Sequence, residues 1–126
     1  MNQTVTQIRG TVVKGALLGR KMGFPTINIA YSKVNIKFGV YVARVYTSYG
    51  VFKGALHFGP RTVIGIEEPS LEVHLLDFSE DLYGQEVKVD VLQKIRDTKS
   101  FDNMDALKRQ IRFDVEYVRA QNILLA

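Results

Sequence analysis

The chain has 126 residues, of which 46% are hydrophobic and 24% are charged, and its formal net charge is +4. This length suits one domain with its own core, and the composition is that of a folded globular protein. The sequence has no cysteine and only two histidines, which excludes disulfides, thiolate metal sites and catalysis by a Cys–His pair. No apolar run approaches the ~20 residues of a membrane-spanning helix and the N-terminus lacks a signal-peptide pattern, so we expect a cytoplasmic protein.

A glycine-rich stretch follows the first predicted strand, which covers residues 8–13. Gly15, Gly19 and Gly23 recur at regular spacing, and Lys21 is one of two cations between them. Backbone N–H groups in a glycine-rich turn can cradle a phosphate, and the cations add charge that attracts it. The stretch is not a P-loop, because the Gly-Lys-Ser/Thr ending is absent, and no helix follows as in a dinucleotide-binding fingerprint. Local chemistry leaves a glycine-rich hairpin with a polar outer face as the alternative.

The second predicted strand covers residues 25–30 and begins with a proline, which suits the first position or an edge because proline has no N–H to give to a ladder. Side chains on a strand alternate, so Thr26 and Asn28 share one face while Ile27 and Ile29 share the other. A hydroxyl and an amide carbonyl about 7 Å apart along the strand can converge on one hard cation. Mg²⁺ beside a nucleotide fits these oxygen ligands.

Four more strands are predicted, over residues 39–46, 51–58, 70–77 and 85–95. The first of these is apolar on both faces, which indicates burial on both sides or a place in a closed barrel, and the second returns from it as a hairpin. Proline and glycine predict a loop over residues 59–69, and a turn is predicted at 81–84. Six strands at turn-punctuated intervals favour a small antiparallel β-barrel, closed so that no long edge is exposed.

Only the end of the chain is predicted to be helical. Asp102 or Asn103 can cap this helix, and the acidic Asp105 suits its first turn. Apolar residues then recur at helical spacing, at Leu107, Ile111, Val115 and Val118. This stripe should pack on the barrel. The segment 96–101 is predicted to be a mobile loop near an opening, with a plain solvated connection as the alternative.

Glu72 stands out because it lies in the middle of an otherwise apolar predicted strand. Leu71, Val73 and Leu75 are expected to face inward, with Glu72 and His74 on the opposite face. If that face lines a cleft, the Glu72 carboxylate could accept a proton from a substrate hydroxyl, as phosphoryl transfer to an alcohol often requires. A glutamate that simply faces water is the alternative.

Several ordered motifs give the chain a resemblance to a known family. They are the glycine loop, Gly-Phe-Pro-Thr-Ile-Asn, Leu-Glu-Val-His-Leu-Leu-Asp-Phe, Asp-Leu-Tyr-Gly, Lys-Ile-Arg-Asp before Lys-Ser-Phe, and the Leu-Lys-Arg-Gln-Ile helix. From about residue 8 to residue 119 the chain resembles a riboflavin kinase. The resemblance implies a mainly β fold, a six-stranded antiparallel Greek-key β-barrel with one C-terminal α-helix, formed by residues 1–126 as a single domain. It also implies transfer of the ATP γ-phosphoryl group to the ribityl 5′-hydroxyl of riboflavin, giving FMN and ADP.

The resemblance further implies roles for individual residues. Those matching the family's nucleotide site are Gly15, Gly19, Lys21, Gly23, Thr26 and Asn28, of which Thr26 and Asn28 also hold Mg²⁺ or another divalent cation. Glu72 matches the catalytic acidic residue. The region that closes over the flavin contains Arg96, Phe101 and Asp105.

The sequence departs from the family pattern in three places. Ile27 replaces the usual alanine, and the segment 59–62 is shorter than the usual Gly-x-Arg-Pro-Thr. No His-x-Gly-His nucleotidyl motif is present, so we expect kinase activity without FAD synthesis. We expect small-molecule substrates, a monomer, no membrane and no nucleic acid. The alternatives are a non-catalytic flavin-binding module and a small basic barrel that binds single-stranded nucleic acid.

Overall fold

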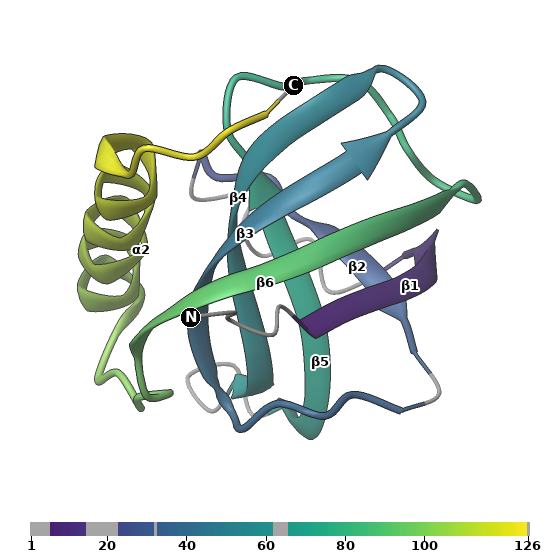
Figure 1. Ribbon diagram of the computed structural model, residues 1–126. Helices are drawn as coiled ribbons and strands as arrows, with labels where there is room; N and C mark the ends of the chain where they lie inside the picture. Colours follow the sequence, from purple (N-terminus) through teal and green to yellow (C-terminus); the bar gives the residue numbers. More distant parts are fainter. Residues whose placement is uncertain (1–5, 15–22, 32, 62–65, 126) are drawn as a thin grey trace.

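The computed structural model of the chain describes residues 6–14, 23–31, 33–61 and 66–125. Within these ranges the chain forms a β-barrel with one helix against its side (Figure 1). The elements are β1 (Thr6–Val13), β2 (Ile27–Ala30), β3 (Gly39–Thr47), β4 (Gly50–Arg61), β5 (Ile66–Leu75), β6 (Glu86–Arg96) and α2 (Met104–Ala120).

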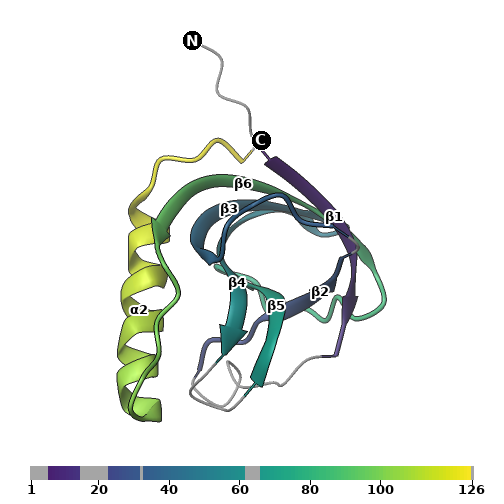
Figure 2. The same ribbon diagram turned by 90° about the horizontal axis from the view of Figure 1, so that it is seen from below.

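The six strands close into a barrel in the order β1-β2-β5-β4-β3-β6, and every neighbouring pair is antiparallel. Figure 2 looks along the barrel and shows the ring of strands, with α2 on one side. The strands β3, β4 and β5 follow one another as neighbours, and β6 returns to lie beside β3, which is a Greek-key arrangement. The predicted fold class is therefore confirmed.

The predicted loop over residues 59–69 is wrong at both ends, because β4 continues to Arg61 and β5 begins at Ile66. Proline lacks the N–H that a ladder needs, which was the reason for predicting a loop here. In the structure Pro60 coincides with a shift of register between Gly59 and Arg61. A proline is tolerated at such an irregularity, because the ladder is already interrupted there.

The second strand is shorter than predicted, since β2 begins at Ile27 rather than at Pro25. Its ladder with β5 starts with the pair of Ile27 and Val73. Pro25 has no amide hydrogen with which to extend the pairing toward the glycine-rich stretch. Thr26 therefore lies just before the strand instead of within it.

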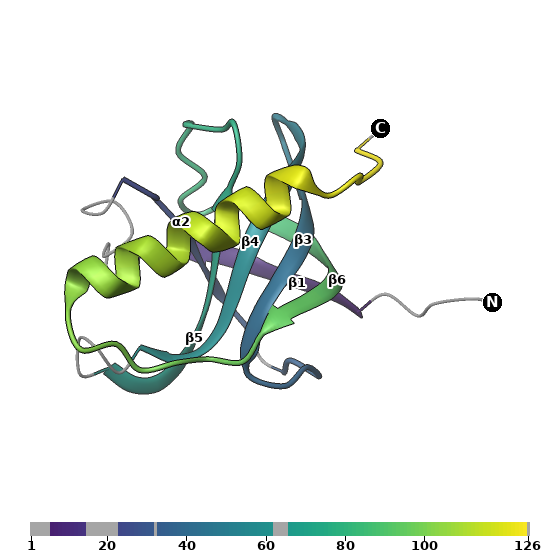
Figure 3. The ribbon, with the colours of Figure 1, turned by 90° about the vertical axis from the view of Figure 1, so that its left-hand side faces the viewer.

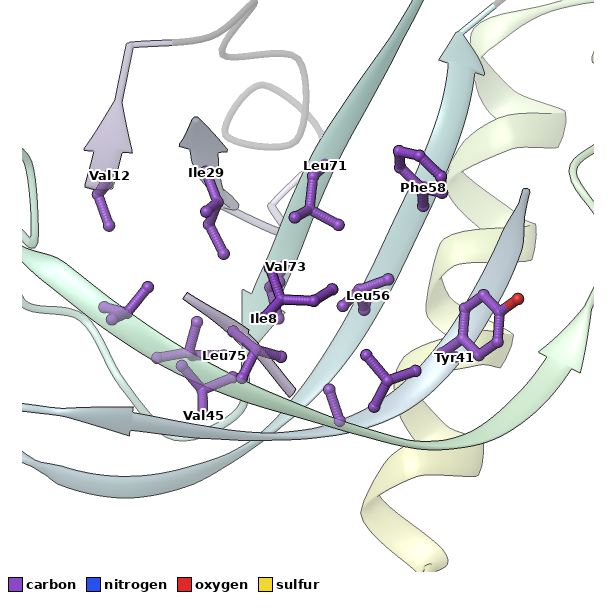
Figure 4. Close-up of a cluster of buried hydrophobic side chains, with 14 of the residues drawn as sticks. Ile8, Val12, Ile29, Tyr41, Val45, Leu56, Phe58, Leu71, Val73 and Leu75 are labelled. Atoms are coloured by element: carbon purple, nitrogen blue, oxygen red, sulfur yellow. The ribbon is translucent and has the colours of Figure 1, made fainter. Parts of the chain in front are cut away.

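The interior of the barrel is filled by apolar side chains from all six strands, several of which appear in Figure 4. Its buried members are Ile8, Val12, Ile29, Tyr41, Ala43, Val45, Leu56, Phe58, Leu71, Val73, Leu75, Leu82, Val87, Val89 and Val91. Full burial of one such aliphatic side chain contributes about 1.5–3 kcal/mol. The inward orientation predicted for the apolar residues of β5 is confirmed.

The helix α2 covers the outside of the barrel, and Figure 3 shows it lying across β3 and β4. Val115 and Val118 of α2 pack with Val42 of β3, which explains why β3 is apolar on both faces. Asn103 caps the helix as predicted, since its side-chain oxygen accepts a hydrogen bond from the N–H of Ala106 at 2.9 Å. In the described ranges no helix combines the length and the apolar character needed to cross a membrane.

A buried carboxylate on the outer face of β6 joins three strands. Asp90, 2% exposed, accepts hydrogen bonds from Gln7 of β1 and from Arg44 and Tyr46 of β3, at distances from 2.8 to 3.0 Å. Burial raises the pKa of Asp90, but the hydrogen bonds from these side chains outweigh it and hold the pKa below its ordinary value. Asp90 is therefore ionised at neutral pH and fixes the packing of β1, β6 and β3.

Candidate active site

Glu72 lies on the outer face of β5, directly opposite Asn28 of β2 in the ladder. The hydroxyl of Thr26 donates a hydrogen bond to Oε1 of Glu72, with 3.2 Å between the two oxygen atoms. Directly opposed residues of an antiparallel pair have neighbouring side chains, so the β2–β5 register brings these groups together. The structure thus joins three of the predicted site residues, although Thr26 and Glu72 are 46 positions apart in the chain.

The Glu72 carboxylate is held at both of its oxygens. Ser70, two residues earlier on the same face of β5, donates its hydroxyl to Oε2 of Glu72 at 3.0 Å. Thr26 occupies Oε1, and the residue as a whole is only 8% exposed. The two hydroxyl groups fix the plane of the carboxylate. Glu72 is therefore an oriented carboxylate rather than one that faces water.

The chemistry of these side chains suits a small, hard cation. Thr26, Asn28 and Glu72 offer a hydroxyl oxygen, an amide carbonyl and a carboxylate within one patch of the surface. Among the described residues, no group of three or more His, Cys, Asp or Glu could hold a metal. Mg²⁺ commonly needs only one or two protein ligands, because water and substrate phosphates complete its shell. The patch fits a metal that is bound together with a nucleotide.

Most of the glycine-rich stretch lies outside the described residues. The predicted site residues Gly15, Gly19 and Lys21 are among those not described. Gly23 is described and has a φ of +85°, in the left-handed region that favours glycine. A Cβ atom added at Gly23 would meet nothing within 4 Å, so the need for glycine is conformational rather than spatial. Gly23 allows the chain to turn sharply just before Thr26.

His74 follows Glu72 on the same outer face of β5 and contacts the segment that carries Thr26. Its Nδ1 lies 2.7 Å from the carbonyl oxygen of Pro25, and the ring of Phe24 packs edge-to-face against the imidazole at a centroid distance of 5.7 Å. Burial lowers the pKa of His74, and the hydrogen bond to Pro25 opposes this only in part. The imidazole is therefore neutral at pH 7, and Nδ1 must carry the hydrogen because a carbonyl oxygen can only accept.

A row of ladder partners joins Glu72 to Arg96 across the barrel. Glu72 is paired with His57 of β4, His57 with Val40 of β3, and Val40 with Arg96 of β6. With about 4.8 Å between neighbouring strands, the backbones of Glu72 and Arg96 are about 14 Å apart along the sheet. The predicted catalytic residue and the predicted flavin region are thus separated by three strand spacings.

Arg96 is the last residue of β6, so the connection predicted over residues 96–101 starts one residue later. Its guanidinium makes a double hydrogen bond to Asp114 of α2, with Nε to Oδ1 at 3.0 Å and Nη2 to Oδ2 at 2.8 Å. Gln110 donates a further hydrogen bond to Asp114 at 3.1 Å. The side chains of Arg96 and Asp114 are only 13% and 5% exposed. This ion pair fixes α2 to the end of β6.

The other two predicted flavin residues lie in the sequence between Arg96 and Asp114, the two partners of this ion pair. Phe101 is half-buried on the connection between β6 and α2, and Asp105 is exposed in the first turn of α2. Neither is in the row of partners that leads to Glu72. The flavin roles of Arg96, Phe101 and Asp105 stay predictions.

Sequence reasoning missed three residues that organise this region, namely Ser70, His74 and Asp114. Strand alternation already placed Ser70 and His74 on the same face as Glu72, and this was the available signal. Asp114 lies in the apolar stripe of the helix, next to Val115. A carboxylate on a buried helix face needs a cationic partner, but the sequence does not say that the partner is at the end of β6.

Comparison with known proteins identifies the family. The family model described as Flavokinase, riboflavin kinase, matches residues 3–122. The RNA-binding riboflavin kinase RibR of Bacillus subtilis is 37% identical over 115 residues, covering 90% of this chain and 50% of that protein. The bifunctional riboflavin kinase/FMN adenylyltransferase of Haemophilus influenzae is 44% identical over 116 residues, covering 90% of this chain and 38% of that protein. The chain thus spans half or less of the length of these relatives.

A solved structure has the same fold. A chain from Streptococcus pneumoniae, described as a macrolide-efflux protein, superposes with a TM-score of 0.83 and 33% sequence identity, covering 94% of this chain and 40% of that one. The description concerns that protein, and the likeness here is one of fold and sequence. The family model and the two curated relatives agree with each other.

Proposed function

Because the chain belongs to the riboflavin kinase family, we propose that it transfers the γ-phosphoryl group of ATP to the ribityl 5′-hydroxyl of riboflavin, giving FMN and ADP. The observation that carries this proposal is the meeting of Thr26, Asn28 and Glu72 on one patch outside the barrel. The patch offers neutral oxygens of the kind that bind Mg²⁺, beside an oriented carboxylate. Phosphoryl transfer to an alcohol needs both of these in one place.

In this proposal Glu72 is the general base. Its carboxylate accepts the proton of the 5′-hydroxyl as that oxygen forms a bond to the γ-phosphorus, while the bond from the γ-phosphorus to the bridging oxygen of ADP breaks. The hydroxyl donors of Thr26 and Ser70 support this role, because they hold the carboxylate in one orientation before substrate arrives. Such positioning accounts for much of the catalysis in phosphoryl transfer.

Thr26 and Asn28 would hold Mg²⁺, or another divalent cation, against the nucleotide phosphates. When bound, the cation neutralises negative charge on the transferring group. We further propose that Gly15, Gly19, Lys21 and Gly23 cover the phosphates, with backbone N–H groups and one ammonium as donors. This assignment rests on the match to the family's loop and on the left-handed turn at Gly23.

The flavin ring is assigned to the far end of the row that starts at Glu72. Arg96, Phe101 and Asp105 are the proposed residues, and the ion pair between Arg96 and Asp114 supports a firm position for the segment that carries them. Both guanidinium nitrogens in that ion pair face Asp114. Arg96 would therefore act on the flavin by positioning the segment as well as by any direct contact.

Three broader assignments accompany this function. We propose that residues 1–126 act as one domain, which the family match over residues 3–122 supports. We also propose that the protein acts as a monomer, as expected from the sequence. We also propose a cytoplasmic location, where ATP is available as a substrate.

The direct test is to incubate the protein with riboflavin, ATP and Mg²⁺ and to separate the products by chromatography. The proposal expects FMN and ADP in equal amounts, and neither product when ATP or the metal is omitted. Tight binding of riboflavin without FMN would instead establish the non-catalytic flavin-binding module.

Nucleic-acid binding needs a test of its own, because RNA binding is part of the name of the Bacillus subtilis relative. This chain covers half of that protein, so the name alone does not assign RNA binding to it. A fluorescent single-stranded oligonucleotide titrated with the protein should show no salt-sensitive binding. Salt-sensitive binding at micromolar protein would revive the nucleic-acid alternative.

A further inference from the structure

We propose that His74 is a positioning residue that holds the Pro25–Thr26 peptide, and through it the Thr26 hydroxyl, against Glu72. This inference rests on the proposed function for its effect on ATP and metal, and on the geometry alone for its effect on the chain. Neither the spacing of the motifs nor the family match assigns His74 a role.

The argument begins where the ladder between β2 and β5 ends. The last pair is Ile27 with Val73, and the next pair in the same register would be Thr26 with His74. The strand stops there, with Pro25 unable to donate a ladder hydrogen bond. The imidazole of His74 continues the connection instead, because its Nδ1 lies 2.7 Å from the Pro25 carbonyl oxygen. A side-chain hydrogen bond thus holds the Pro25–Thr26 segment, which the backbone ladder does not reach.

The hydrogen bond acts on Thr26 because the Pro25 carbonyl belongs to the same rigid peptide unit as the Thr26 nitrogen. The proline ring also restricts the backbone on the other side of that unit. Fixing this plane places the Thr26 backbone, and its hydroxyl then lies 3.2 Å from Oε1 of Glu72. The edge-to-face contact with Phe24 holds the imidazole from the side of the glycine-rich stretch.

Two substitutions separate the hydrogen bond from the packing. His74→Asn keeps a donor nitrogen the same number of bonds from the backbone as Nδ1, whereas His74→Phe keeps an aromatic ring beside Phe24 but has no donor. Val89→Ala is the matched control, because Val89 is fully buried on β6, which is paired with β1 and β3 and not with β2 or β5. Its cavity lowers stability but removes neither the hydrogen bond of His74 to Pro25 nor its contact with Phe24.

The first readout is hydrogen exchange of a peptide that covers residues 23–28, measured without substrates. The loss of one hydrogen bond predicts about tenfold faster exchange in His74→Phe, with near-normal exchange in His74→Asn and in Val89→Ala.

The second readout is steady-state kinetics. His74→Phe should raise the KM for ATP and the half-saturating Mg²⁺ concentration about tenfold, with the KM for riboflavin changed less than about twofold, and His74→Asn should restore both.

If the 23–28 peptide of His74→Phe exchanges at the wild-type rate, the positioning role is overturned. The same holds if Val89→Ala speeds the exchange of this peptide as much as His74→Phe does. Equal rises in the KM values for ATP and riboflavin would also overturn it, since they would indicate a general loss of structure. If the wild-type protein makes no FMN, the proposed function fails, while the exchange experiment still decides what His74 does to the chain.

Discussion

Removing Asp114 should destabilise the protein by about 3 kcal/mol, because breaking a buried ion pair leaves one charge without its partner at a typical cost of 3–5 kcal/mol. The Asp114 carboxylate is 5% exposed at the side chain and accepts hydrogen bonds from both Arg96 and Gln110. Asp114→Ala therefore leaves the Arg96 guanidinium, 13% exposed, facing an apolar replacement. The lower end of the range applies because Arg96 keeps its hydrogen bond to the carbonyl oxygen of Asp97 at 3.0 Å.

Urea unfolding followed by circular dichroism measures this loss as a lower midpoint at an unchanged slope. Glu116→Ala is the control, since Glu116 is an exposed acid on the same helix and should change the free energy of unfolding by less than about 0.5 kcal/mol. The double substitution of Arg96→Met with Asp114→Leu should recover most of the loss, because it removes both charges together. A loss below about 1 kcal/mol for Asp114→Ala would refute the reasoning that this ion pair attaches α2 to the barrel.

Three further predictions concern the site and the buried Asp90. Glu72→Gln should lower kcat by at least about 100-fold while the Kd for riboflavin changes little, since a general base acts only in the chemical step; near-normal turnover would exclude that role. Thr26→Ala and Asn28→Ala should each raise the Mg²⁺ concentration needed for half-maximal FMN formation, because each removes one oxygen ligand. Unchanged metal dependence would make these two residues purely structural. The pKa of Asp90 is depressed in the folded protein, so its stabilisation is full above the unfolded pKa of about 3.9 and is lost as the pH falls through the folded value. Urea unfolding of the Asp90→Asn variant should therefore show a smaller decline in stability below pH 4 than the wild type shows, and parallel curves would contradict the assignment.

Much of the fold could be predicted because alternation of side chains is a strong local signal. The apolar character of β3 on both faces predicted burial on both sides or a place in a closed barrel. Both hold, because one face of β3 lines the barrel interior and the other packs against α2. The largest errors in the strand boundaries arose near prolines. Pro25 was predicted to begin a strand and Pro60 to lie in a loop, yet Pro25 precedes its strand while Pro60 lies at an irregularity within one. The outcome depends on neighbouring strands that the local sequence does not reveal.

The candidate site was predictable only in part. Thr26, Asn28 and Glu72 could be singled out from their motifs, but their meeting depends on the register between β2 and β5. Register is set by tertiary packing and not by either strand alone. The contact of His74 with the Pro25 carbonyl could not be predicted for the same reason, since it exists only once the two strands lie side by side.

The most direct test of the account is a crystal structure of the protein grown with ADP, Mg²⁺ and FMN. The account predicts that the phosphate ester oxygen of FMN lies within hydrogen-bonding distance of the Glu72 carboxylate, with the metal bound to Thr26 or Asn28. A flavin phosphate bound elsewhere on the barrel, with these three side chains in contact only with each other and with water, would contradict it.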